Sequence, residues 1–439
     1  MWRWSWVGLV LVGVLGYGWW IGREAEQRVM VYRQVLREAG LPGSYQESVD
    51  RFHSLDRSKT RQWMDILDAE SATDQGVSFV LGQDVETTPC SGETWVAEGL
   101  MREFEERSEP LIRAIAEADT GGKPVWLPMQ VRADAILISL LSGQRGLARI
   151  VNNRFALAVH DGDAETAMEM LRLAEVVADA FDYPGSLVAL LINSAVRQSA
   201  TVRIGESLRC GLWSAEQLDR LADHIERNLP TLEHLRESAV NEFLLFENGG
   251  FEPLSPQWMA DGIYRDGIAE QQTWGQLLRN LDRLALLYPV RSDGLVGRPT
   301  LESPSRLRGY DGDSFWALPS VLRGEQFWNA ESIGERLANH LRHQRERAEL
   351  VRIGIEAAKF EMRQGRWPES TRELEMGVTS DTAAGPMFEI RPASFDGVRV
   401  EQVYRILRYG DFEPLSEAER KEFGVDVGRA SGGVGAERL

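Results

Sequence analysis

The chain has 439 residues, of which 43% are hydrophobic, and its formal net charge at pH 7 is −18. This length can bury a large core and form two or three domains. The acidic balance argues against nucleic acid as a general partner, because clustered Lys and Arg are needed to neutralise backbone phosphates. Cys90 and Cys210 are the two cysteines, and the sequence has no C-x-x-C zinc or redox motif. It leaves open whether they form a disulfide in an exported protein or remain separate thiols.

Residues 4–21 form an uncharged apolar run that is long enough for a short membrane-spanning helix. Tryptophans flank both ends, as in the aromatic belts at membrane interfaces, namely Trp2, Trp4, Trp6, Trp19 and Trp20. We therefore expect residues 1–22 to be an uncleaved single-pass anchor in the cytoplasmic (inner) membrane. A cleaved signal peptide is the alternative, but no A-x-A-like cleavage site follows the run.

The basic residues on the two sides of this run favour opposite orientations of the membrane helix. Arg3 and the amino terminus precede it, which suits a cytoplasmic N-terminus. Four arginines follow it and favour a cytoplasmic body instead: Arg23, Arg28, Arg33 and Arg37. Because large domains are translocated despite local charge, we expect the body to be exported.

Residues 23–125 are predicted to be a helical region with an irregular loop. The predicted helices span residues 23–39, 44–70 and 95–118. A Gly-Leu-Pro-Gly break at 40–43 separates the first two, because Gly and Pro interrupt helices. Residues 71–94 are rich in Thr, Gly, Ser and Asp, so the loop is predicted there.

Residues 126–288 are predicted to be a body of antiparallel helical hairpins around which the other helices pack. Apolar residues recur there at i, i+3, i+4 and i+7, the spacing of one buried helix face. Gly162 can end one helix and Asp163 can cap the next, and Gly211 and Ser214 repeat this arrangement. Short connections make successive helices antiparallel neighbours. The predicted helices span residues 131–160, 164–181, 186–208, 215–227, 230–248 and 269–288.

Two segments of the C-terminal part are predicted to be irregular. Residues 289–328 are dense in Gly, Pro, Ser and Asp and are expected to be a connector that packs on the helical body. Residues 412–439 are polar and are expected to be a mostly disordered tail.

Between them, residues 329–411 are predicted to form a long helix followed by a small α+β unit. The helix is expected over residues 330–364, where Gly365 ends it. Ser370 can cap a single turn. Alternation of apolar and polar residues predicts short antiparallel strands at residues 387–390 and 398–409. The expected fold class is therefore mainly α, with a transmembrane helix, a hairpin body and a small C-terminal α+β unit.

The segment from residue 147 to 226 resembles uncharacterised, membrane-anchored, mostly helical proteins of planctomycete-type bacteria. The likeness rests on the runs NRFALAVHDGDAETAMEMLRLAEVVADAF, PGSLVALLI and GLWSAEQL. The first run is also similar to a tetratricopeptide (TPR-like) hairpin, although the sequence has no sustained 34-residue period. The resemblance implies a membrane anchor and a helical body, and that family has no assigned activity.

Residues 356–375 resemble the pseudopilin-like segment that often closes those proteins, a helix followed by G-R-Y-P-x-S-L-x-E-L. The matching residues are Gly365, Arg366, Pro368, Ser370, Glu373 and Leu374. Trp367 stands where Tyr is usual, and residues 385–411 are similar to the strands that follow in such domains. True pseudopilins carry this domain directly behind their membrane helix, whereas more than 300 residues intervene here.

The sequence contains no phosphate-binding glycine loop, H-E-x-x-H, G-x-S-x-G or EF-hand motif. Its histidines are weaker candidates. His340 and His343 share a helix face and could bind a metal with Glu335, but neighbouring arginines repel a cation. The alternative for this pair is a solvated basic face. His224 and His234 could meet, yet a metal site needs several converging ligands, and the alternative is again that no metal binds.

His160 lies beside Asp161 and Asp163 and could take part in acid–base chemistry, but a helix–turn–helix explains these residues without catalysis. Asp311 and Asp313 could bind calcium, although the remaining ligand spacing is missing and a plain turn is the alternative. The scattered tryptophans of the body are expected to be core or interface anchors. We assign no catalytic, cofactor-binding or metal-binding residue from the sequence, and we expect no cofactor.

Three functions remain. The preferred one is a non-enzymatic, membrane-anchored scaffold that uses residues 4–21 as its anchor and binds an unidentified protein partner. It depends on the anchor, the TPR-like hairpins and the lack of catalytic motifs. The second is a component of a pilus- or secretion-like envelope assembly, which depends on the C-terminal resemblance. The third is an enzyme with an unrecognised site.

Overall fold

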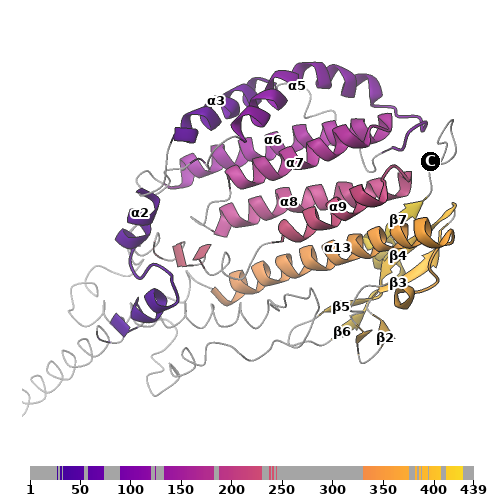
Figure 1. The fold of residues 1–439 in the computed structure, drawn as a ribbon. Coiled ribbons are helices and arrows are strands. Elements are labelled where there is room, and N and C mark those ends of the chain that lie inside the picture. Colours follow the sequence, from indigo (N-terminus) through magenta and orange to yellow (C-terminus); the bar gives the residue numbers. More distant parts are fainter. Residues whose placement is uncertain are drawn as a thin grey trace, which may run out of the picture.

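The computed structural model describes residues 27, 30–31, 33–53, 58–73, 89–119, 124, 133–181, 187–229, 237–238, 240–241, 244, 330–374, 381–382, 385–386, 388–393, 395–406 and 412–428. This part of the chain is mostly helical and ends in a small antiparallel sheet. The helices lie in successive layers, and the sheet packs beside one end of the last helix (Figure 1).

The layers follow the order of the chain. The first contains α3 (Ser58–Thr73) and α5 (Glu98–Ala118), and it is preceded by α2 (Tyr45–His53). The hairpin of α6 (Ala133–Asp161) and α7 (Ala164–Ala180) comes next. It is followed by α8 (Leu187–Ser207), the short 3₁₀ turn η1 (Leu208–Cys210) and α9 (Ala215–Arg227). Finally, α13 (Ala330–Gln364) packs against α8 and α9.

Local chemistry at the two predicted turns confirms the hairpin boundaries. Gly162 has φ of +74°, a left-handed conformation that Gly adopts without steric cost. Asp163 then caps α7 by accepting a hydrogen bond from the Thr166 amide at 3.0 Å. Gly211, with φ of +59°, ends η1, and Ser214 forms a reciprocal capping box with Gln217 at the start of α9.

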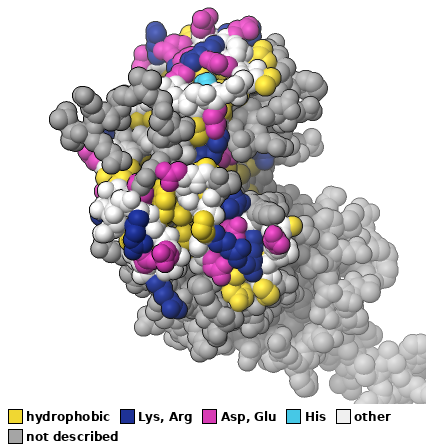
Figure 2. All heavy atoms as spheres, turned by 90° about the vertical axis from the view of Figure 1, so that its right-hand side faces the viewer, with side chains coloured by type: hydrophobic (Ala, Val, Ile, Leu, Met, Phe, Trp, Pro, Cys, Tyr) yellow, Lys and Arg dark blue, Asp and Glu magenta, His cyan; other side chains and the backbone are white. Residues whose placement is uncertain are grey.

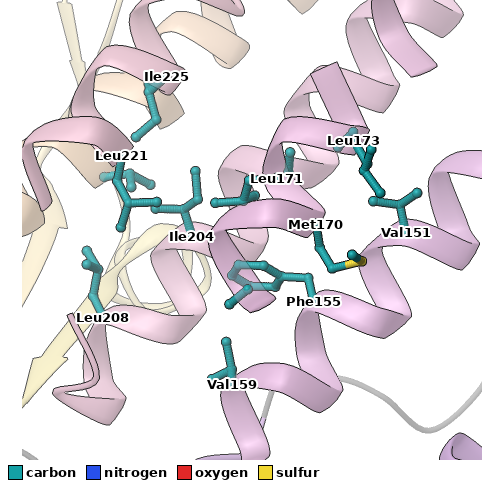
Figure 3. Close-up of a cluster of buried hydrophobic side chains, with 14 of the residues drawn as sticks. Val151, Phe155, Val159, Met170, Leu171, Leu173, Ile204, Leu208, Leu221 and Ile225 are labelled. Atoms are coloured by element: carbon teal, nitrogen blue, oxygen red, sulfur yellow. The ribbon is translucent and has the colours of Figure 1, made fainter. Parts of the chain in front are cut away.

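The core lies where the hairpin layers meet. Phe155 and Val159 of α6, Met170 of α7, Ile204 of α8 and Leu221 of α9 point into one apolar cluster (Figure 3). Each of these side chains is at most 4% exposed, so the cluster excludes water. Full burial of such a side chain contributes about 1.5–3 kcal/mol. Trp213 completes the cluster by stacking on Phe155, with 6.2 Å between ring centroids, as expected for a core tryptophan.

The C-terminal sheet contains β3 (Phe388–Pro392), β4 (Gly397–Gln402) and β7 (Val425–Gly428), in the order β3-β4-β7. Both pairings are antiparallel, with Ile390 opposite Val400 and Val400 opposite Val425. The sheet packs on α13 through β4 and β7. The remaining small elements are η3 (Thr371–Glu373), β1 (Asp381–Thr382) with β2 (Gly385–Pro386), β5 (Tyr404–Ile406) with β6 (Phe412–Pro414), and α14 (Glu417–Phe423).

Gly354 allows the sheet to approach α13 closely. A Cβ atom at this position would lie 3.0 Å from the Leu208 side chain and 3.3 Å from the side chains of Val425 and Val427. These separations are shorter than ordinary van der Waals contact, so any larger residue would push the sheet away from the helix.

Some boundaries differ from those predicted. Residues 412–428 were expected to belong to a disordered tail but form β6, α14 and β7. β6 pairs with β5, a Ser416 capping box starts α14, and Val425 and Val427 of β7 are buried against α13. α5 begins at Glu98 rather than at residue 95. Ser370 precedes η3, but its side chain makes no capping bond; the Glu373 carboxylate instead accepts from the Glu369 amide at 3.1 Å.

Several predictions lie outside the described residues. They include the membrane anchor at residues 1–22, the connector at 289–328, the helix at 269–288 and residues 429–439. The predicted helix at 44–70 is described as α2 and α3, and residues 54–57 between them are not described. Within the described ranges, no helix combines the length and apolar character needed to cross a membrane.

Candidate functional site

The 3₁₀ turn η1 is where three distant parts of the chain meet. Cys210 forms a disulfide with Cys90, which lies 120 residues earlier, and their Cα atoms are 5.1 Å apart. At the end of β7, a Cβ on Gly428 would lie only 2.6 Å from the Arg209 carbonyl oxygen. The N-terminal region, the hairpin body and the C-terminal sheet are thus joined at one corner of the molecule.

The segment that carries Cys90 consists of residues 89–97 and leads into α5; we call it the 89–97 segment. Pro89 and Cys90 are buried, whereas residues 91–94 are exposed. Val96 is fully exposed. A segment with so few buried apolar contacts has little stability of its own, so its position depends on the bonds that attach it to the body.

Glu93 supplies the second attachment of this segment. Its carboxylate accepts hydrogen bonds from both terminal nitrogens of Arg209, at 3.0 and 2.8 Å, and from the Cys90 amide at 2.7 Å. Partial burial alone would raise the pKa of the Glu93 carboxyl. The bonds from Arg209 and Cys90 outweigh burial and hold this pKa below its ordinary value. The bidentate ion pair therefore lies beside the disulfide and joins the same two parts of the chain.

His160, near the C-terminus of α6, lies under the other end of the 89–97 segment. The ring is 9% exposed, and the Trp95 ring meets it edge-on with 5.3 Å between centroids. Its Nε2 is 3.8 Å from the Glu98 carboxylate, which is longer than a hydrogen bond. Its Nδ1 is buried and has no hydrogen-bond partner within the described residues.

Asp161 does not serve His160 as an acid–base partner. Both of its carboxylate oxygens accept from Arg102 of α5, one of them at 2.6 Å from Nη1. Asp163 is likewise engaged, since it caps α7. The predicted cluster thus holds a helix–turn–helix and ties it to α5. Figure 2 shows acidic and basic side chains close together over the end of the molecule that lies on the right in Figure 1.

His224 forms a second histidine–carboxylate pair, inside the body. Its Nδ1 is 2.8 Å from the Glu175 carboxylate of α7, and the side chain is 4% exposed. Its Nε2 is buried and has no hydrogen-bond partner within the described residues. Burial alone would raise the pKa of Glu175, but the hydrogen bond from His224 and the charges of His224, Arg227 and Arg197 together lower it. The pair joins α7 to α9.

The other sequence candidates do not form a site in the described residues. The His343 ring is 53% exposed and contacts the Glu346 carboxylate at 3.2 Å. The side chains of His340 and Glu335, the whole of His234, and the possible calcium turn around Asp311 lie outside the described residues. No cluster of three or more potential metal ligands occurs in the part of the chain that the structure describes.

Sequence reasoning named the cysteines, His160 and His224 as candidates, but it missed Glu93, Arg209, Arg102 and Glu175. Arg209 and Glu93 are 116 positions apart, and Arg102 and Asp161 are 59 apart, so no local pattern indicated either pair. The presence of two cysteines was the one signal that pointed to this corner. In comparisons with protein families, curated proteins and solved structures, nothing matches this chain.

Proposed function

We propose that this protein is a non-enzymatic, membrane-anchored scaffold whose helical body lies outside the cytoplasm and binds another protein. The observation that carries the proposal is the Cys90–Cys210 disulfide. Disulfides persist in oxidising compartments and are rare in the cytosol, where thiols are kept reduced. A body that is folded around such a bond therefore favours export, and the uncharged run at residues 4–21 supplies the anchor.

The layered body supports a binding role. Its antiparallel hairpins present long helix surfaces, as the similarity to a tetratricopeptide hairpin and to the planctomycete-type helical proteins implies. At the N-terminal end of α5, Val96 is fully exposed and Leu100 is 44% exposed. Glu98 lies between them in the sequence, and Arg102, which follows, forms an ion pair with Glu98. Apolar side chains rimmed by charges are typical of protein contact sites.

The histidine pairs favour this role over an enzyme. A general acid or base must come within hydrogen-bonding distance of the proton that it transfers. His224 is 3% exposed and already contacts Glu175, so a substrate has no direct access to it in this structure. His160 is covered by Trp95, and the neighbouring Asp161 carboxylate is held by Arg102.

The location of the body can be tested by thiol labelling that leaves the disulfide intact. Glu165 is 78% exposed at the start of α7, so a Glu165→Cys side chain should react with a membrane-impermeant maleimide. Labelling in intact cells, at a yield close to that in lysed cells, is expected. Labelling only after lysis would place the body in the cytoplasm and contradict the proposal. Ala167→Cys is the matched control, because Ala167 is 0% exposed and should stay unlabelled in a folded protein.

The binding role has a separate test. A photo-crosslinking amino acid at Val96 should yield a defined adduct with one other protein in living cells, because this side chain is fully exposed. The same amino acid at Glu165, on another exposed part of the body, is the matched control. Adducts of equal pattern at both positions, or none at Val96, would count against a scaffold that uses this end of the molecule.

A second candidate is a component of a pilus- or secretion-like envelope assembly. The observation in its favour is that the long helix α13 packs on an antiparallel sheet, as the pseudopilin-like resemblance implies. Arg391 on β3 is 49% exposed, and Arg391→Gln removes its charge without placing a third carboxylate beside Glu389 and Glu401. This proposal expects Arg391→Gln to remove the protein from high-mass envelope complexes in native gels. Unchanged migration would count against it.

A further inference from the structure

We propose that the 89–97 segment is a redox-dependent strap, which the Cys90–Cys210 disulfide holds closed over His160 and which opens when that bond is reduced. The attachments of the segment divide into two groups. Towards η1 it is held by the disulfide and by the Glu93–Arg209 ion pair. Towards α6 it is held by Trp95, which packs on His160 and on the small cluster of Met101 and Leu157.

The strap can open without unfolding the body, because the two have separate supports. The helices beneath it bury a large core of their own, whereas the segment itself is mostly exposed between residues 91 and 96. The Glu93 and Arg209 side chains are 45% and 27% exposed, so solvent screens the attraction between their charges. The disulfide is therefore the dominant bond between the segment and η1, and its loss shifts the segment towards open states.

A dithiol reduces the Cys90–Cys210 bond by thiol–disulfide exchange. One thiolate of the dithiol attacks a sulfur of the Cys90–Cys210 bond and forms a mixed disulfide with one cysteine, while the other cysteine leaves as a thiolate. The second thiol of the dithiol then displaces the first cysteine. Two electrons and two protons pass to Cys90 and Cys210, and the dithiol leaves as a disulfide.

Opening exposes a particular set of groups. Trp95 moves away from the His160 ring, and the ring gains access to solvent through its Nε2, which faces Glu98 at 3.8 Å. His160 then lies at the surface next to Glu98 and Leu100 of α5, whose side chains are 46% and 44% exposed. The oxidised form covers the imidazole, and the reduced form presents it.

Histidine carbethoxylation with diethyl pyrocarbonate tests this directly, with each site quantified by mass spectrometry. The full-length chain is compared with its Cys90→Ala/Cys210→Ala variant. The rate at His160 is expected to rise at least about tenfold in the variant, because a cross-link restrains the attached chain by more than the ~1.4 kcal/mol that a factor of ten represents. His343, which is 53% exposed, should react quickly in both proteins, and His224, which is 3% exposed, slowly in both.

Glu93→Gln is the matched control, because it weakens the ion pair to Arg209 and keeps the disulfide. It should change the His160 rate by less than about twofold, in line with the small energy of an exposed pair. An equal rise in Glu93→Gln and the double variant would show that the ion pair closes the strap, and would overturn the proposal. An unchanged rate at His160 in the double variant, or a rise at both His160 and His224, would overturn it as well.

Hydrogen exchange on the natural sequence measures opening of the strap without depending on the folding of the double variant. The full-length chain is exchanged in its oxidised form and after brief treatment with dithiothreitol. Exchange of amides in residues 89–97 is expected to accelerate at least about tenfold on reduction, while amides of α9 (Ala215–Arg227) keep their protection. Equal acceleration in both regions would indicate global unfolding and contradict a separate strap.

Discussion

At the scale of single residues, the pair formed by the buried His224 and the half-buried Glu175 has the clearest energetic consequence. Glu175→Gln removes the charge that His224 and Arg227 contact at 2.8 and 3.2 Å. We expect it to lower the free energy of unfolding at pH 7 by about 1–3 kcal/mol, because a neutral amide is a weaker acceptor than the carboxylate for the buried imidazole and the guanidinium. Urea denaturation of both proteins at pH 7 measures this difference.

The same substitution predicts a pH dependence. The pKa of Glu175 is lower in the folded protein than its ordinary value, so its stabilising contribution is complete above that ordinary value. It is lost as pH falls through the lowered folded pKa. The difference between natural protein and Glu175→Gln should therefore shrink between pH 5 and pH 3. A difference that stays constant over this range would contradict the assignment.

Glu169→Gln serves as the control for both measurements. Glu169 also lies on α7 and contacts Arg172 at 2.7 Å, but both side chains are at least 40% exposed. Because exposed ion pairs contribute little, this variant should lose less than about 1 kcal/mol. A loss as large as that of Glu175→Gln would mean that burial does not distinguish the two carboxylates.

At the scale of elements, the close approach of α13 and the C-terminal sheet depends on Gly354. Gly354→Val places methyl groups against Leu208, Val425 and Val427, which already leave only 3.0–3.3 Å for a Cβ. We expect a loss of about 1–3 kcal/mol from overpacking, and a selective loss of protection from hydrogen exchange in β7. Thermal denaturation and hydrogen exchange measure these effects.

Gly99→Val is the matched control for this prediction. Gly99 lies in the first turn of α5, and a Cβ there meets nothing within 4 Å. The substitution should therefore be neutral or slightly stabilising, because Gly is a poorer helix former than Val. Equal destabilisation by both variants would show that backbone effects, and not contact with the sheet, explain the loss at Gly354.

The elements that the sequence predicted well are those whose ends are set by local chemistry. α7, α9 and the end of α13 begin or end at Asp163, Ser214 and Gly365, whose caps and left-handed turns act within four residues. β7 was missed because Val425–Gly428 is too short to show a pattern, and it becomes a strand only through pairing with β4 and burial against α13.

A row of buried polar side chains between the helices is a second feature that the sequence did not predict. Gln144 of α6 contacts Asn193 of α8, and Ser194 of α8 contacts Gln344 of α13. All four residues are at most 5% exposed. Polar side chains such as these are normally expected to face solvent, because burying an amide or hydroxyl is unfavourable unless it finds a hydrogen-bond partner. Here the partners come from neighbouring helices, which the sequence does not show.

At the scale of the whole molecule, the disulfide closes the largest covalent loop. Removing it by Cys90→Ala/Cys210→Ala should lower the free energy of unfolding by about 2–5 kcal/mol, because the 120-residue separation no longer restricts the unfolded chain. Guanidinium denaturation measures the shift. The variant must also become insensitive to dithiothreitol; a natural protein whose midpoint does not move on reduction would contradict a formed disulfide.

The amino-acid sequence by itself determined the helical class of the molecule and the turns of its hairpins. It did so because apolar periodicity, glycine turns and polar caps act between residues close together along the chain. The two cysteines and the histidines were visible in it as candidates, with their pairing and roles left open.

Only the tertiary structure decided which of these residues meet. It joined Cys90 to Cys210, Glu93 to Arg209 and Glu175 to His224, and it turned residues 425–428 into a buried strand. The physical reason is the same in each case. The partners are separated by between 25 and 120 positions along the chain, and their contacts form only when the helical layers bury a common core.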